Sequence, residues 1–116
     1  MGKEQQKLMV NLMKHSEAIQ PVVQFTPAIL DKQVATSSRE ITKLKLVSVG
    51  GSAHVSVYDN ANSEANPAEL KWVLDSSLNV NDTDDFFNPL HFQRGVYMVC
   101  DDGFAFSPQV CITYIP

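Results

Sequence analysis

The densest group of residues that could do chemistry is the run NDTDD, from Asn81 to Asp85. Its side chains carry oxygen atoms, which are the ligands that calcium prefers. The glycine and the distal glutamate of an EF-hand loop are missing at their required spacing. A calcium loop and a solvated acidic loop both remain open, and we favour the solvated loop. Residues 59–64, DNANSE, pose the same choice, and there we favour a turn closed by Asx hydrogen bonds.

Residues that could act as nucleophiles or bases do not form a recognisable set. His15, His54 and His91 are far apart in sequence, and none stands at metal-ligand spacing with another ligand. Gly50-Gly51 precedes a strand-like run and not a helix, so it does not predict a phosphate loop. The serines form no nucleophile elbow. We therefore predict no enzyme, no catalytic residue, no metal and no cofactor.

Cys100 and Cys111 are the two cysteines. Alternation in the last strand-like run directs Cys111 outward, whereas Cys100 shares the inward side of its own run. Side chains on opposite faces of a sheet cannot reach disulfide geometry, so two free thiols are expected. Free thiols fit a reducing compartment.

Charge is distributed unevenly along the chain. Residues 1–45 contain seven Lys or Arg and four Asp or Glu. Residues 46–116 contain two Lys or Arg and nine Asp or Glu. An acidic body repels nucleic acid, so no nucleic-acid partner is expected. No apolar run is long enough to span a bilayer, and the N-terminus lacks the core of a signal peptide. We therefore expect no membrane partner and no secretion.

Residues 44–59, LKLVSVGGSAHVSVYD, show the clearest structural pattern. Two runs of period-two alternation flank Gly50-Gly51, which predicts a β-hairpin. Further strands are expected near 69–75, 89–92, 95–100 and 109–115, with the acidic segment 76–88 as a loop. Many short strands predict an all-β fold, an antiparallel sandwich or jelly-roll-like domain. The predicted core is Leu44, Leu46, Val55, Val57, Leu70, Trp72, Leu74, Leu90, Phe92, Val96, Met98, Val110, Ile112 and Tyr114.

The N-terminal third has a different pattern. Residues 3–18 predict a short helix, with a narrow apolar stripe of Leu8, Met9, Leu12 and Met13. Such a helix is marginal alone and needs a surface, either its own domain or a partner. Pro21 and Pro27 exclude a continuous helix through the next segment, which predicts an extended arm and then a polar linker over 33–40. We therefore divide the chain into residues 1–38 and a β-sandwich domain, 39–116.

Residues 41–116 resemble small virion proteins of tailed bacteriophages. The resemblance lies in LKLVSVGGSA, VSVYD, LKWVL, NPLHFQRGVYMV and the closing VCITY. It implies a β-sandwich or jelly-roll-like domain that serves in capsid decoration (as a cement protein) or in a short fibre, commonly as a trimer. The acidic segment at 78–88 is longer here than in that family, and the N-terminal appendage is an addition. The family implies no catalytic residues.

The resemblance predicts a virion structural protein, made in the host cytoplasm, that binds the major capsid protein as a homotrimer. The alternative is a head or tail fibre module that binds a receptor or glycan, with outward Tyr58 and Tyr97 stacking on sugars. An apolar arm joined to a β domain suits docking on another surface, although self-docking is equally open. The candidate partner-binding residues are Leu8, Leu12, Val22, Val23, Phe25, Ile29 and Leu30.

Overall fold

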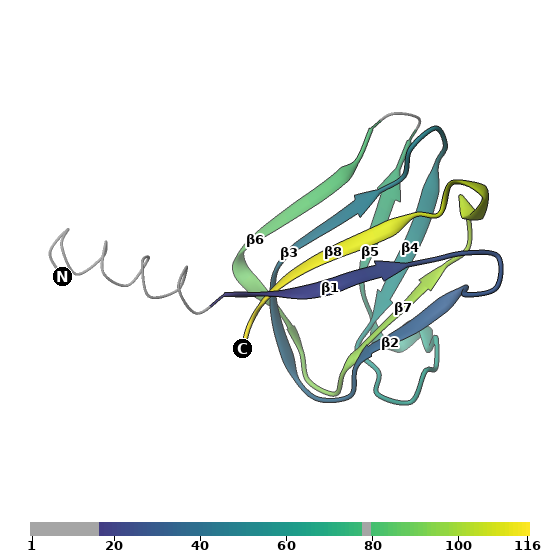
Figure 1. Cartoon of the computed structure of the whole chain (residues 1–116). Coiled ribbons are helices and arrows are strands. Elements are labelled where there is room, and N and C mark those ends of the chain that lie inside the picture. The colour runs from purple at the N-terminus through teal and green to yellow at the C-terminus, as the bar shows by residue number, and fades with distance from the viewer. Residues whose placement is uncertain (1–16, 78–79) are drawn as a thin grey trace, which may run out of the picture.

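The computed structural model describes residues 17–77 and 80–116 (Figure 1). These residues form eight β-strands and two short 3-10 helices, η1 and η2. The elements are β1 (Ala18–Gln24), β2 (Asp31–Ala35), β3 (Arg39–Val47), β4 (Ala53–Tyr58), η1 (Pro67–Glu69), β5 (Leu70–Ser76), β6 (Asp82–Phe92), β7 (Val96–Cys100), η2 (Phe104–Phe106) and β8 (Gln109–Ile115). The all-β prediction is confirmed.

The strands form two four-stranded sheets that face each other. One sheet has the order β1-β8-β3-β6 and the other has the order β2-β7-β4-β5. All pairs are antiparallel, and they nest: the first strand pairs with the last, the second with the seventh, the third with the sixth and the fourth with the fifth. A long hairpin rolled into two layers has this connectivity, which is that of a jelly roll.

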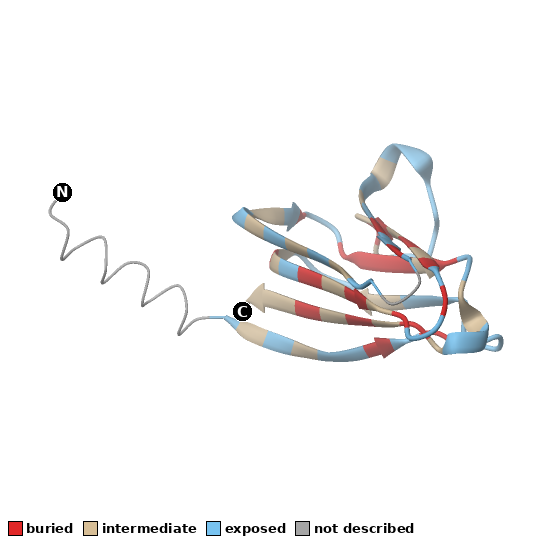
Figure 2. Ribbon diagram, turned by 90° about the horizontal axis from the view of Figure 1, so that it is seen from above, coloured by how far each residue is buried: buried red, intermediate tan, exposed pale blue. Residues whose placement is uncertain are grey.

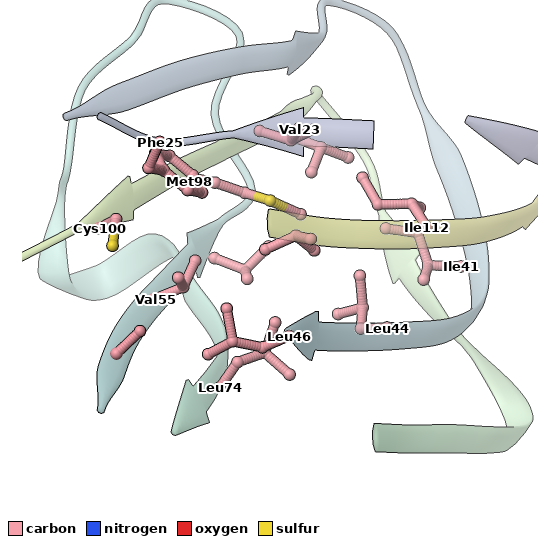
Figure 3. Packing of buried hydrophobic residues seen from close by; sticks show 14 of the residues in the cluster. Val23, Phe25, Ile41, Leu44, Leu46, Val55, Leu74, Met98, Cys100 and Ile112 are labelled. Carbon is pink, nitrogen blue, oxygen red and sulfur yellow. The ribbon is translucent and has the colours of Figure 1, made fainter. Parts of the chain in front are cut away.

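The core lies between the two layers. Along the strands, buried positions alternate with more exposed ones, as period-two sequence patterns require (Figure 2). Side chains from both sheets project into one interior (Figure 3). The predicted core residues that are buried are Leu44, Leu46, Val55, Val57, Leu74, Phe92, Val96, Met98, Val110 and Ile112. Trp72, Leu90 and Tyr114 are partly buried against this core, whereas Leu70 is exposed, and its assignment to the core was wrong.

The hairpin predicted over residues 44–59 is also wrong. β3 pairs with β6 and β8, whereas β4 pairs with β5 and β7 in the other sheet. The glycines therefore lie in a connection between layers. They make room for an aromatic ring, since a Cβ on Gly51 would lie 2.2 Å from the side chain of Phe106. Period-two alternation is the same for a hairpin and for a crossover, so the sequence did not separate the two.

Residues 18–35 belong to the sandwich and do not form a separate extended arm. β1 pairs with β8, and β2 pairs with β7. The predicted boundary between residues 38 and 39 therefore cuts through the fold, and of the predicted linker only Thr36–Ser38 lies outside strands. Pro21 excluded a helix but not a strand: β1 is an edge strand, and its register shifts between Gln20 and Val23. The predicted helix, apart from its last two residues, lies outside the described residues; Ala18 already belongs to β1.

The fold predicts that deleting residues 1–38 unfolds the chain. The deletion removes β1 and β2, exposing the edges of β8 and β7 and the core that Val23, Phe25 and Ala35 cover. Circular dichroism should show loss of cooperative thermal unfolding. Deleting residues 1–16 removes no described strand and serves as the control. A folded 39–116 fragment would contradict the prediction.

Phe25→Ala tests the same point with one side chain. Phe25 is fully buried, so the variant should lose about 3–5 kcal/mol in the free energy of unfolding. Val49→Ala, at a residue that is 74% exposed, should change it by less than about 0.5 kcal/mol. Denaturant titration measures both values, and equal losses would show that Phe25 is not a core residue.

Candidate functional site

A groove runs along the side of the sandwich where β1 and β2 lie. Its volume is about 390 Å³, and its lining is Gln20, Pro21, Val22, Val23, Gln24, Ile29, Lys32 and Val34. A tight turn connects the two strands, with Thr26 and Ile29 exchanging backbone hydrogen bonds of 3.0 Å. The Thr26 hydroxyl also accepts a hydrogen bond from the Ile29 N–H. The turn is therefore well defined and holds Ile29 and Leu30 beside the groove.

The predicted partner-binding residues separate into three groups. Val22, Ile29 and Leu30 are exposed and free to contact another molecule. Val23 and Phe25 are buried in the core, so they cannot contact a partner while the sandwich is closed, and their assignment as contact residues was wrong. Leu8 and Leu12 lie outside the described residues, and their role stays a prediction.

The groove is better suited to side-chain contact than to strand addition. β1 and β2 are the outermost strands of their sheets, and edge strands offer free backbone groups to other chains. Pro21 has no N–H, and the register of β1 shifts beside it. Lys32 places a charge on β2. Proline, bulges and lysine are the features by which edge strands avoid pairing with other strands.

A second group of polar side chains lies on the outer face of the β2-β7-β4-β5 sheet. His54 Nδ1 lies 2.5 Å from Asp75 Oδ1, and His54 Nε2 lies 3.5 Å from Ser56 Oγ. This order of groups is that of a Ser-His-Asp triad, which sequence spacing had not indicated because Asp75 comes from β5. β4 is paired on both sides, so its backbone N–H groups serve the sheet and cannot form an oxyanion hole at Ser56. We therefore interpret the group as a surface ion pair.

The charge state of His54 follows from its neighbours. The hydrogen bond with Asp75 raises the pKa of His54 above 6.5; partial burial opposes this, and the charges of Asp75, Asp101 and Asp102 add to it. Folding therefore favours the imidazolium form of His54 relative to the unfolded chain.

The tyrosines proposed as a glycan platform pack against each other, with Tyr97 buried and Tyr58 half-buried. The rings of Tyr58 and Tyr97 lie 6.2 Å apart, and the Tyr97 hydroxyl donates to Asp31 Oδ2 at 2.5 Å. Burial, together with this carboxylate, raises the pKa of Tyr97 to about 12. Tyr97 is only 6% exposed, so its ring offers no face for a sugar to stack on.

From Asp82 onward the acidic segment belongs to strand β6, contrary to the predicted loop. Asp82 and Asp84 of β6 face β5, where they accept hydrogen bonds of 2.8 Å from the Asp75 N–H and from Trp72 Nε1. Partial burial, with neighbouring carboxylates, raises the pKa of Asp82. The adjacent Asp85 has an exposed side chain. Strand alternation thus places Asp85 on the opposite side of β6 from Asp82 and Asp84, whose oxygens accept hydrogen bonds from β5.

The oxygens of residues 59–64 serve the protein itself. Asp59 accepts hydrogen bonds from the backbone N–H groups of Gln93, Arg94 and Gly95, which lower its pKa although burial opposes this. Asn60 Oδ1 accepts from the N–H groups of Asn62 and Glu64, which is the Asx turn we favoured. Across residues 17–77 and 80–116, no three His, Cys, Asp or Glu side chains gather closely enough to hold a metal ion.

The two cysteines are free thiols, as predicted. Cys100 is buried, its Sγ donates to the Asp102 carbonyl at 3.0 Å, and burial raises its pKa. Cys111 is half-buried on the outer face of β8. In the part of the chain described, no helix has the length and apolar character needed to cross a membrane.

Comparisons with known proteins give no family. No family model matches the chain, and no curated protein matches it. Among solved structures, PirA is 10% identical over 87% of this chain and 94% of its own, with a TM-score of 0.40. Drosophila melanogaster CENP-C bound to CAL1 and a dTDP sugar isomerase from Desulfovibrio desulfuricans each have a TM-score of 0.26. The CENP-C structure is 19% identical over 79% of this chain and 59% of its own. The isomerase is 15% identical over 84% of this chain and 55% of its own. These similarities are too low to support an argument about function.

The His54–Asp75 pair predicts a pH-dependent contribution to stability. Because the folded-state pKa of His54 is raised, the contribution is complete below pH 6.5 and is lost as the pH rises through the folded-state pKa. Asp75→Asn should therefore cost less than about 1 kcal/mol near pH 5.5, and close to nothing near pH 8.5. Asp85→Asn, at an acid 3.9 Å from Lys43, is the control without a histidine. Denaturant titrations at both pH values measure the difference, and a cost that grows with pH would contradict the assignment.

Proposed function

We propose that this chain is a structural protein of a phage virion, a capsid decoration (cement) protein that binds the major capsid protein and stabilises the shell. Two features support the proposal: the resemblance of residues 41–116 to small phage virion proteins, and the jelly-roll fold. Jelly rolls occur in viral capsid domains but also in lectins and cupins, so the fold alone does not select this function.

The observation that carries the proposal is the apolar turn between β1 and β2. Ile29 is 47% exposed and Leu30 is 46% exposed, side by side and next to a groove with a mixed apolar and polar lining. The hydrogen bonds of the turn, with the bond from the Cys100 N–H to the Leu30 carbonyl, hold these residues against the sandwich. Apolar side chains on a fixed turn lose little entropy on binding, which favours a stable interface.

The proposed partner is the capsid shell, bound by a homotrimer of this chain in the virion. The alternative proposal, a fibre module for a receptor or glycan, has less support, because Tyr97 is buried and only the half-buried Tyr58 remains of its two named tyrosines. The acidic body supports a protein partner over nucleic acid.

Co-sedimentation with capsids assembled without this chain tests the proposal. Ile29→Asp and Leu30→Asp each place a charge in the expected contact and should weaken binding at least about tenfold, or about 1.4 kcal/mol. Val80→Asp is the matched control, because Val80 is 58% exposed and lies between β5 and β6 on the other side of the sandwich.

Circular dichroism should show that all three variants remain folded. Two results would contradict the proposal: no binding of the unaltered chain to capsids, or equal binding by the unaltered chain and both turn variants.

A further inference from the structure

The outer face of the β1-β8-β3-β6 sheet has a hollow that begins where the N-terminal segment enters the fold. Its volume is about 410 Å³, and its lining is Glu17, Ile19, Thr42, Lys43, Asp85 and Thr113. The pairing registers place Ile19 beside Thr113, Thr113 beside Lys43, and Lys43 beside Asp85. The hollow therefore follows one row of side chains across all four strands.

Exposed apolar side chains lie at one end of this row and close to its other end. On β1, Ile19 is 79% exposed. On β6, Phe87 is 95% exposed and lies two residues after Asp85, where the pairing of β6 with β3 shifts register, while Phe86 packs edge-on against Trp72 with ring centroids 4.8 Å apart. An exposed isoleucine in the lining of the hollow and an exposed phenylalanine two residues beyond Asp85 indicate that something covers the face.

The segment that precedes Glu17 has the composition to cover this face. Residues 3–14 carry Leu8, Met9, Leu12 and Met13 at helical spacing, together with Lys3, Lys7 and Lys14. A helix of twelve residues is about 18 Å long. Three strand spacings, the width of the sheet, amount to about 14 Å. A helix of this length can therefore cross the sheet, and the lysines can approach Glu17 and Asp85.

We propose that residues 3–14 dock on the outer face of their own β1-β8-β3-β6 sheet, with the Leu8 and Leu12 side chains over the hollow between Ile19 and Phe87. The same chain is favoured over a second copy because the hollow starts at Glu17. A tethered segment acts at an effective concentration in the millimolar range, which few free partners reach. The proposal does not depend on capsid binding, which we assign to the turn of Ile29 and Leu30.

Cys111 is a natural probe of this face. It lies on the outer side of β8 beside Lys45, one outward position along the strand from Thr113. That distance is about 7 Å, within the width of a docked helix. Cys100, which is buried, reacts only when the sandwich opens and reports unfolding in the same sample.

The experiment follows the reaction of Cys111 in the full chain with a thiol reagent, using mass spectrometry to separate the two cysteines. The double variant Leu8→Asp/Leu12→Asp should react several-fold faster at Cys111, with Cys100 unchanged. Ile19→Ser/Phe87→Ser should accelerate Cys111 similarly, and combining all four substitutions should add little. Val49→Asp/Val80→Asp, on the connections between layers, should leave the rate unchanged.

Equal rates in the unaltered chain and in both double variants would overturn the proposal. A Cys111 rate that falls as protein concentration rises would also overturn it, because a second copy would then be the occupant.

Discussion

The pairing of the first described strand with the last is the constraint on which the rest of the structure depends. β1 lies against β8, and each inner pair of the roll follows from it. β1 covers the edge of β8. Val23 and Phe25, which come from the opposite end of the chain, join Val110 and Ile112 in the core. Because the partners are far apart in sequence, no stretch of the chain can complete a layer by itself. β1 and β2 are therefore part of the folded sandwich.

The end of the roll opposite the β1–β2 turn is closed by hydrogen bonds more than by apolar contact. Gln33 Nε2 donates to the carbonyls of Ala35, Asn60 and Val96, and its Oε1 accepts from Ser63. Gly95 is required there, since a Cβ would lie 2.5 Å from the Ala35 carbonyl. A single glutamine thus joins β2, β7 and the long 59–69 connection. Such a network satisfies buried backbone groups and leaves few of them for a ligand.

The sequence predicted the layers of the fold better than its connections. Alternation identified the buried faces of β3, β4, β7 and β8, because burial on one face of a strand is a local property. It could not tell that β3 and β4 lie in different sheets. The acids of β6 suggested a loop, since aspartate is rare in strands; they are tolerated because β6 is an edge strand whose inward acids find donors on β5. The Asp75–His54–Ser56 row needed the β4–β5 register, which the sequence does not reveal.

The two open sides of the roll differ in a way that bears on binding. On the β5–β6 side, hydrogen bonds join the layers: Trp72 Nε1 donates to Asp84, and the Asp75 N–H donates to Asp82. The charges of these acids oppose the approach of an edge strand from another sheet. On the β1–β2 side, the layers are joined by a turn that displays Ile29 and Leu30. Val22 and Val23 show why the sequence could not assign this surface alone. The two are neighbours of the same type, yet one is exposed and the other buried, and the register shift next to Pro21 determines which. Candidate contacts on such an edge can therefore be chosen only once the register of the strand is known.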